Sequence, residues 1–315
     1  MTSQDRESVL TICLMAAFAD GNNDERERAE IKRITESLAE GADFNTAALY
    51  QKVLQKQVTL SEVAKQLSTQ ESKQLAFEMA VCVCDADGAH SAAETAFLDQ
   101  LRDQLGLDAA KSASFVNDAA AIASAPVATT VASTNIIEPH FASTMTNEEM
   151  DKMILNYSIL NGALELLPQS LASMAIIPLQ MKMVYRLGKL HGFELDRSSI
   201  KDFLATLGVG LTSQYVEQIG RRLIGGLLGK IAGGIGGGLG SAATGSAFSF
   251  ASTYALGQVA KRYYAGGRTI NTDTLKSAFS GLLSEAKSMQ TRYLPDIQQR
   301  AKTLDISQVM QAVRQ

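Results

Sequence analysis

The chain has 315 residues, of which 46% are hydrophobic, and a formal net charge of −4. This length allows two ordinary domains, and the three cysteines are too few for a disulfide framework, which favours a reducing compartment. The charge is divided unevenly, because residues 1–118 carry 20 acidic and 11 basic side chains whereas residues 119–315 carry 13 and 18. The split predicts that the second half of the chain meets an anionic surface.

Residues 1–118 are predicted to form a bundle of short amphipathic helices. Apolar residues recur at helical spacing in three stretches, the first between Val9 and Ala16, and none shows the alternation of a strand. Cys82 and Cys84 lie in the last of these stretches, and we interpret them as small core residues rather than a zinc or redox site. The opening MTSQDRES lacks the basic and apolar regions of a signal peptide, so we expect a cytoplasmic location or the cytoplasmic face of a membrane.

An acidic turn occurs twice in this half. Asp20-Gly21 is followed by Glu27, and Asp87-Gly88 is followed by Glu94, so both copies read D-G-x5-E and lie 67 residues apart. Each copy comes directly after an apolar helical stretch. The repeat therefore predicts two helix–turn–helix units within one bundle.

Two interpretations of these turns stay open. In the first, the turns only shape the chain: a glycine after a helix supplies left-handed backbone, and Ser91 with Glu94 forms a capping box. In the second, acidic side chains of both turns converge as oxygen ligands of a divalent cation, either Ca²⁺, Mn²⁺ or Zn²⁺. The predicted ligands are Asp20, Glu27, Asp87 and Glu94, with Asp24 and Asp85 as further donors. His90 is expected to be a solvated residue of the second turn.

The segments CLMAAFADGNNDERERAEIKRI and CVCDADGAHSAAETAFLDQL resemble the TerB-like domain of tellurite-resistance proteins. The resemblance covers roughly residues 5–118. It implies an all-helical bundle with acidic turns, for which metal binding has been proposed. The implied metal residues are the four predicted ligands named above.

A linker is predicted over residues 119–147, where alanine, serine, threonine and valine dominate around two prolines. Helices resume beyond it at 148–165 and 198–211, and the apolar run 159–181 between them contains Pro168 and Pro178, which should break or kink a helix. The last predicted helices, 273–290 and 296–313, are interpreted as surface or partner-binding segments. The predicted domains after the linker are 148–270 and 271–315.

Small residues recur at every fourth position within residues 223–260, where Lys230 is the one charged residue. On a helix this spacing puts them on a single stripe, where another backbone can approach closely, as in many membrane helix pairs. Because glycine in a helix costs about 1 kcal/mol relative to alanine, the run needs a compensating contact. The predicted packing stripe consists of Gly225, Gly229, Gly233, Gly237, Ser241 and Gly245.

The length of this run decides how it could meet a membrane. A single 38-residue helix would be about 57 Å long, nearly twice the ~30 Å hydrocarbon thickness, so a two-helix hairpin turning near 236–241 fits better. The flanking bases Arg221, Arg222, Lys261 and Arg262 would then contact lipid headgroups on one side. A soluble core or a homo-oligomer interface is the alternative, because glycine, serine and threonine replace the expected leucine and isoleucine. Nucleic acid is not an expected partner.

The second half has a resemblance of its own. The segment PLQMKMVYRLGKLHGFELDRSSIKDFL, the glycine-rich run and SFASTYALGQVAKRYYAGG are together similar to the YcjF-type domain, over roughly residues 150–270. The resemblance implies membrane association and partnership with a GTPase or a stress response. It implies no established reaction.

The sequence as a whole predicts an all-α protein: a bundle with two duplicated helix–turn–helix units, a linker, and a helical domain with a glycine-zipper hairpin. Since no catalytic constellation is recognised, we expect a non-enzymatic protein. The expected function is a membrane-associated bacterial stress or envelope adaptor at the cytoplasmic face of the inner membrane, with lipid, a GTPase or another protein as partner. The alternative is a soluble, metal-responsive binding protein of the tellurite-resistance type.

Overall fold

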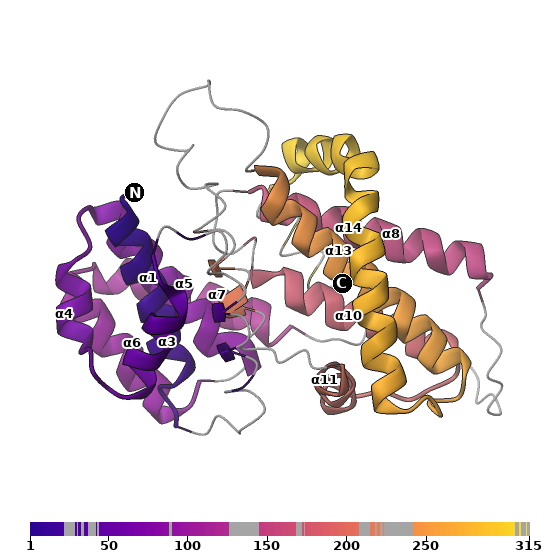
Figure 1. Ribbon diagram of the computed structural model, residues 1–315, viewed down its shortest axis with the longest axis horizontal. Helices are drawn as coiled ribbons and strands as arrows, with labels where there is room; N and C mark the ends of the chain where they lie inside the picture. The colour runs from indigo at the N-terminus through magenta and orange to yellow at the C-terminus, as the bar shows by residue number, and fades with distance from the viewer. Residues whose placement is uncertain are drawn as a thin grey trace. The chain divides into compact units, whose positions relative to one another are not determined.

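The computed structural model describes residues 1–21, 29, 31–32, 35–36, 42, 44–87, 90–125, 145–167, 172, 174–207, 215–217, 219–220, 223, 242–305, 309 and 313. Every regular element within these ranges is a helix, which confirms the predicted all-α class (Figure 1). The chain divides into two compact units, described separately below. Unit 1 comprises Met1–Ser124, Pro168–Met174 and Gly210–Thr244, and unit 2 comprises Ala125–Leu167, Ala175–Val209 and Gly245–Gln315.

The helices of unit 1 begin at residues whose side chains satisfy backbone N–H groups of the first turn. Its described elements are α1 (Ser3–Ala17), α3 (Thr46–Leu54), α4 (Leu60–Lys65), α5 (Gln70–Cys84), the 3-10 helix η1 (Asp85–Asp87), α6 (Ala92–Leu105) and α7 (Ala109–Ala123). The capping residues of the α-helices are Thr2, Asn45, Thr59, Thr69, Ser91 and Asp108. Polar residues before each apolar stretch therefore set where these helices start.

Helix α1 is central to unit 1, since it packs against α3, α4, α5 and α6. Neighbours on several sides explain why α1 is apolar on most of its surface, with a run of fully buried residues from Val9 to Leu14 broken only by Thr11, which is 4% exposed. Cys13, Cys82 and Cys84 are all buried, and none of them forms a disulfide. This confirms the interpretation of the cysteines as core residues.

The predicted start of the linker at residue 119 is wrong. Helix α7 continues to Ala123, and its last turn is packed, because Ala119, Ile122 and Ala123 are at most 2% exposed. The alanine-rich composition that indicated a linker instead reflects small residues on a buried helix face. The rest of the predicted linker up to residue 144 lies outside the described residues, apart from 124 and 125.

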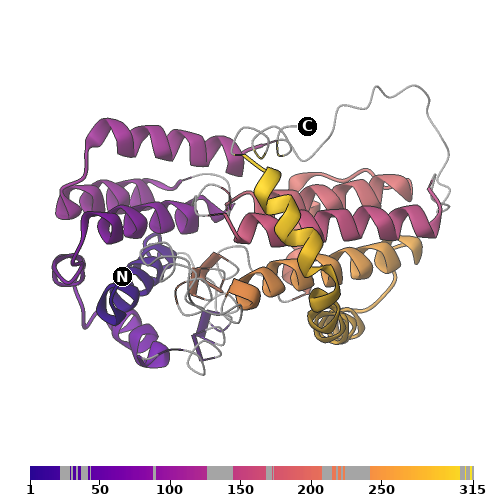
Figure 2. The same cartoon turned by 90° about the horizontal axis from the view of Figure 1, so that it is seen from above.

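Unit 2 contains five described helices: α8 (Asn147–Glu165), α10 (Ile176–Leu190), α11 (Arg197–Thr206), α13 (Ala242–Ala265) and α14 (Thr272–Thr303). Helix α8 packs against α10 and α14, and α11 contacts the same two helices (Figures 1 and 2). Ala163, Phe250 and Ile297, from α8, α13 and α14, form a shared buried cluster. The segment 271–315 therefore contributes to the core of this unit and is not a separate surface region as predicted.

The prolines of unit 2 correct two further expectations. Pro178 does not break a helix, because it lies in the first turn of α10, where a missing N–H removes no hydrogen bond within the helix. Pro295 lies inside α14, so one helix stands where two were predicted. Pro168 follows the end of α8 and lies outside the described residues.

Helix α13 continues the four-residue spacing of the predicted packing stripe. Gly245 is part of its backbone, and Ser249, Thr253 and Gly257 follow at the same interval. These positions meet α8 in antiparallel order, with Ser249 bonded to Glu165, Thr253 to Asn161, and Gly257 against Ile154. Ser249, Thr253 and Gly257, which continue the spacing beyond the predicted stripe, thus pack against another helix of the same unit. The positions Gly225, Gly229, Gly233, Gly237 and Ser241 lie outside the described residues, and so does the predicted hairpin turn.

Candidate functional site

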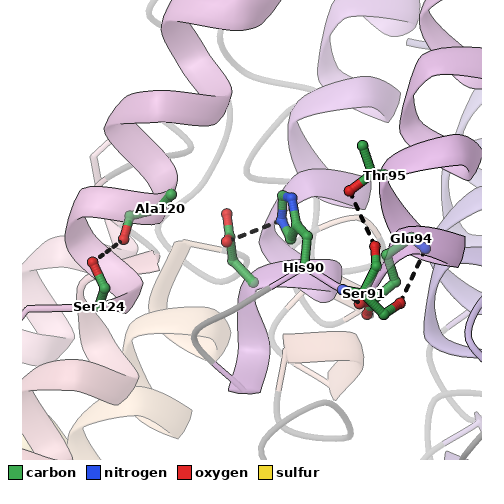
Figure 3. A network of polar contacts seen from close by, with 7 residues as sticks. His90, Ser91, Glu94, Thr95, Ala120 and Ser124 are labelled. Carbon is green, nitrogen blue, oxygen red and sulfur yellow. Dashed lines mark hydrogen bonds and ion pairs between the residues drawn. The ribbon is translucent and has the colours of Figure 1, made fainter.

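The second acidic turn contains a buried carboxylate. The apolar helix α5 ends at Cys84, and the chain continues as η1, which packs against α5 and α7. Asp85, the first residue of η1, is 1% exposed. Its Oδ1 lies 3.0 Å from Nε2 of His90. Figure 3 shows the His90 ring with a dashed line to a carboxylate.

The hydrogen bonding of Oδ2, the other carboxylate oxygen of Asp85, differs from that of Oδ1. Within the part of the chain that the structure describes, Oδ2 is buried and has no hydrogen-bond partner. Burying a carboxylate is costly unless donors or a positive charge compensate for the lost water. Asp85 therefore has capacity for one further positive or hydrogen-donating partner.

His90 is not the solvated turn residue that we expected. Its side chain is only 14% exposed and lies at ion-pair distance from Asp85. From the sequence, Asp85 was predicted only as a further oxygen donor. A signal for the pair was present, because Asp85 directly follows the apolar run from Met79 to Cys84, whose residues are all buried. An acid that continues such a run is expected to be buried and to need a partner.

Glu94 takes part in the predicted capping box. The backbone N–H of Ser91 donates to Oε2 of Glu94 at 2.7 Å, and the N–H of Glu94 donates to the Ser91 hydroxyl at 3.2 Å (Figure 3). Thr95 extends the same cap through a 3.0 Å bond from its hydroxyl to the Ser91 carbonyl. The predicted capping box of Ser91 and Glu94 is therefore confirmed, and one oxygen of Glu94 is already engaged.

The first turn has the backbone that the same interpretation predicts. Gly21 has a φ of +70°, the left-handed conformation that glycine adopts most readily, and its N–H donates to the Phe18 carbonyl at 3.3 Å. Asp20, just before it, is half-buried. Gly88, the equivalent glycine of the second turn, lies outside the described residues.

Acidic side chains from both turns raise the pKa of one buried thiol, that of Cys84. Burial raises the pKa of Cys84 well above its usual value, and Glu94, Asp85, Cys13 and Asp20 raise it further. The carboxylates of Asp20 and Glu94, which come from different copies of the repeat, are thus close enough to influence the same buried atom. A thiol with a raised pKa stays protonated at neutral pH, so Cys84 is a poor nucleophile and a core residue.

The predicted four-carboxylate metal site is only partly visible. Asp20 and Glu94 are described, Asp87 is described only as backbone of η1, and Glu27 and Asp24 lie outside the described residues. Among the side chains that the structure does describe, no three histidine, cysteine, aspartate or glutamate residues are grouped so as to bind a metal ion. Asp85 with His90 supplies two donors of such a set.

The predicted lipid-contacting residues differ in their surroundings. Lys261 lies 2.8 Å from Asp151 and also donates to the Asn147 carbonyl at 3.2 Å, and its side chain is 13% exposed. Arg262 is exposed, and Arg221 and Arg222 lie outside the described residues. None of the helices in the described ranges is both long and apolar enough to cross a bilayer.

The first part of the chain is similar to a known protein family. Residues 2–119 match the model of a family described as "Protein of unknown function (DUF533)", which is a TerB-like family. The matched stretch ends within α7 and contains both acidic turns. No curated protein and no solved structure gives a significant match. The resemblance of the second half to the YcjF-type domain remains a prediction.

Proposed function

We propose that this protein is a non-enzymatic adaptor whose TerB-like bundle binds a divalent cation at the second acidic turn and thereby changes its affinity for a protein partner. The buried carboxylate of Asp85 is the observation that supports the proposal. One of its oxygens faces His90, and the other has no partner among the described residues. A cation at this carboxylate would supply the missing positive charge.

The donor set favours Mn²⁺ or Zn²⁺ over Ca²⁺. Imidazole nitrogen is a common ligand of transition metals, whereas Ca²⁺ is bound by oxygen atoms alone. Oδ1 of Asp85 and Nε2 of His90 are 3.0 Å apart. Two neighbouring ligands, each ~2.1 Å from one ion, are separated by about the same distance. The remaining ligands would come from the predicted residue Asp87 and from water.

The position of η1 gives the cation a means of changing the bundle. This short helix packs against both α5 and α7. An ion bound at its first residue would hold η1 in its position against these two helices, because the ligands at 85 and 90 flank the turn. The surface formed by α7 and the second turn would then differ between the metal-bound and metal-free protein, which is how a partner would sense the ion.

Calorimetric titration of the full chain with Mn²⁺ and with Zn²⁺ tests the proposal. We expect saturable binding that weakens by about tenfold or more in Asp85→Asn and in His90→Gln, since removing a metal ligand costs at least one strong bond. Asp99→Asn in α6 is the matched control, because Asp99 is exposed and, among the described residues, pairs with Arg102. Absence of heat in the unchanged protein, or equal binding by Asp85→Asn and Asp99→Asn, would reject the cation site.

Membrane association is a second candidate function, supported by a charge pattern. Residues 219–271 contain six basic side chains and no acidic one, and Arg262 and Arg268 of this stretch are exposed. Such a segment is attracted to anionic lipid headgroups. Flotation with phosphatidylglycerol vesicles, together with carbonate washing of cell membranes, is the test. Recovery entirely in the soluble fraction without vesicle binding would rule this candidate out. A GTPase partner remains an expectation from the YcjF-type resemblance.

A further inference from the structure

Unit 2 has an open pocket of about 500 Å³ between α8, α10 and α14. This volume lies in the range of small-molecule sites, roughly 300–1,000 Å³. Its wall is apolar along Ile159, Leu160 and Leu179, and basic at Arg186 and Arg300. An apolar surface beside two guanidinium groups suits a ligand that has both an anionic and an apolar part.

Arg186 and Arg300 have no acidic partner among the residues that the structure describes. Among the described residues, no carboxylate lies at ion-pair distance from either guanidinium, including Asp296, which precedes Arg300 by one turn of α14. Arg186 is half-buried, and its guanidinium lies 5.7 Å above the ring of Tyr157, which also lines the pocket. A partly desolvated guanidinium without a counter-charge favours binding of an anion.

A third basic side chain, Lys182, lies near the charge of Arg186. Lys182 lies one turn before Arg186 on α10 and is 2% exposed, and its Nζ donates to the Val313 carbonyl at 2.6 Å. Burial, with a contribution from the nearby charge of Arg186, lowers the pKa of Lys182 to about 8. Repulsion between these two groups means that an anion beside Arg186 would also stabilise the charged form of Lys182.

The pocket continues into a neighbouring hollow of about 340 Å³ that shares Tyr157 and Arg186. Lys152 and Glu149 are on its border. The carboxylate of Glu149 accepts a 2.8 Å hydrogen bond from the Thr146 N–H in the capping box of α8, so it is engaged at its own helix. The two hollows together have room for more than an isolated ion, and their lining holds three basic side chains and one acidic one.

We propose that this pocket binds an amphiphilic anion, with its phosphate or carboxylate group on Arg186 and Arg300 and its hydrocarbon chain along Ile159, Leu160 and Leu179. Such a ligand could be a free amphiphile or a lipid in a membrane, and the two share the same recognition chemistry. The inference is independent of the cation site, because that site belongs to unit 1.

Calorimetry of the full chain with decyl phosphate, below the concentration at which it forms micelles, tests the inference. Inorganic phosphate and decanol are the matched partial ligands. We expect decyl phosphate to bind more tightly than either, and its dissociation constant to rise about tenfold or more in Arg186→Gln/Arg300→Gln. Arg300→Gln alone, at an exposed position, should show part of this loss without any risk to folding. Arg292→Gln is the control, since Arg292 lies on α14 outside the pocket and packs on Tyr293.

The titrations and the flotation assay together test the inference and distinguish the two sources of the ligand. Equal affinity of the unchanged protein and both pocket variants, or equal affinity for decanol and decyl phosphate, would overturn the inference, and so would a lack of binding. If the pocket variants lose decyl phosphate and also lose flotation with phosphatidylglycerol vesicles, a membrane lipid is the source of the ligand. If they lose decyl phosphate while no form of the protein floats, the ligand is a free amphiphile.

Discussion

Asp5 in α1 is fully buried, and its carboxylate accepts hydrogen bonds from Ser68, which lies 63 residues further along the chain. The N–H of Ser68 donates to Oδ1 of Asp5 at 2.8 Å, and the Ser68 hydroxyl lies 3.0 and 2.8 Å from the two oxygens. The N–H of Thr2 donates to Oδ2 at 2.9 Å. Burial by itself would raise the pKa of Asp5, but these hydrogen bonds outweigh it and lower the pKa to about 2.

Replacing Asp5 by asparagine should destabilise unit 1 in a pH-dependent way. The pKa of Asp5 is lower in the folded than in the unfolded state, so its contribution is complete above about pH 4 and is lost as the pH falls through 2. The shift from 3.8 to about 2 corresponds to about 2 kcal/mol at neutral pH. Urea unfolding at several pH values should therefore show a deficit in Asp5→Asn that shrinks between pH 4 and 2. Asp118→Asn, at an exposed position of α7, is the control, and parallel pH profiles for the two variants would disprove the account.

A methyl group at Gly257 should weaken the contact between α13 and α8. A Cβ there would stand 2.6 Å from Cγ2 and 2.9 Å from Cγ1 of Ile154, a fully buried and branched side chain. Overpacking of this kind costs roughly 1–3 kcal/mol. Gly281→Ala in α14 is the matched control, because nothing lies within 4 Å of the added atom, and helix propensity should stabilise it by roughly 0.5–1 kcal/mol. Thermal unfolding of both variants is the measurement, and stabilisation by Gly257→Ala would refute the close approach.

Pro295→Ala should stabilise unit 2. Pro295 is exposed and lies inside α14, where it cannot donate the hydrogen bond that continues the helix. Alanine restores this donor, and we expect a gain of roughly 1–3 kcal/mol in the free energy of unfolding. Calorimetric melting of the variant beside the unchanged protein checks this. A lower melting temperature would show that the packing around Ile297 depends on the proline.

Variants at Lys261 and Arg262 should distinguish a contribution to stability from a contribution to lipid binding. Lys261→Met removes the ion pair with Asp151, which is 48% exposed, so we expect a loss of about 0.5–1 kcal/mol and unchanged vesicle flotation. Arg262→Gln should leave stability unchanged, because Arg262 is exposed, and should reduce flotation if the second half contacts anionic lipid. Reduced flotation of Lys261→Met together with unchanged flotation of Arg262→Gln would contradict this distinction.

Local features of the fold were predictable from the sequence, and long-range ones were not. The capping box of Ser91 and Glu94 depends on residues three positions apart, so its pattern is visible directly. The continuation of α14 through Pro295 is stabilised by Ile297, which packs against Ala163 and Phe250 from other helices. Local rules for proline contain no information about such contacts. The same reason explains why the pairing of Asp5 with Ser68 has no signature in the sequence.

In the candidate site, too, local features were predicted from the sequence and long-range contacts were not. The acidic turns and their repeat were recognised, because their spacing is local. The burial of Asp85 was not predicted: the apolar run before it is a local signal, but the contact of η1 with α7, about 25 residues further along the chain, has none. His90 lies 3.0 Å from this carboxylate and is little exposed, which its place in a turn did not indicate. The sequence therefore indicated the correct turn but ranked its carboxylates differently from the structure.

The imidazole ¹⁵N resonances of the three histidines during a Zn²⁺ titration of the full chain test the central claim most directly. If an ion binds at Asp85 and His90, the His90 resonances shift saturably, those of His191 in unit 2 do not, and Asp85→Asn abolishes the shift. Unchanged His90 resonances at saturating Zn²⁺, or a His90 shift that persists in Asp85→Asn, would contradict it.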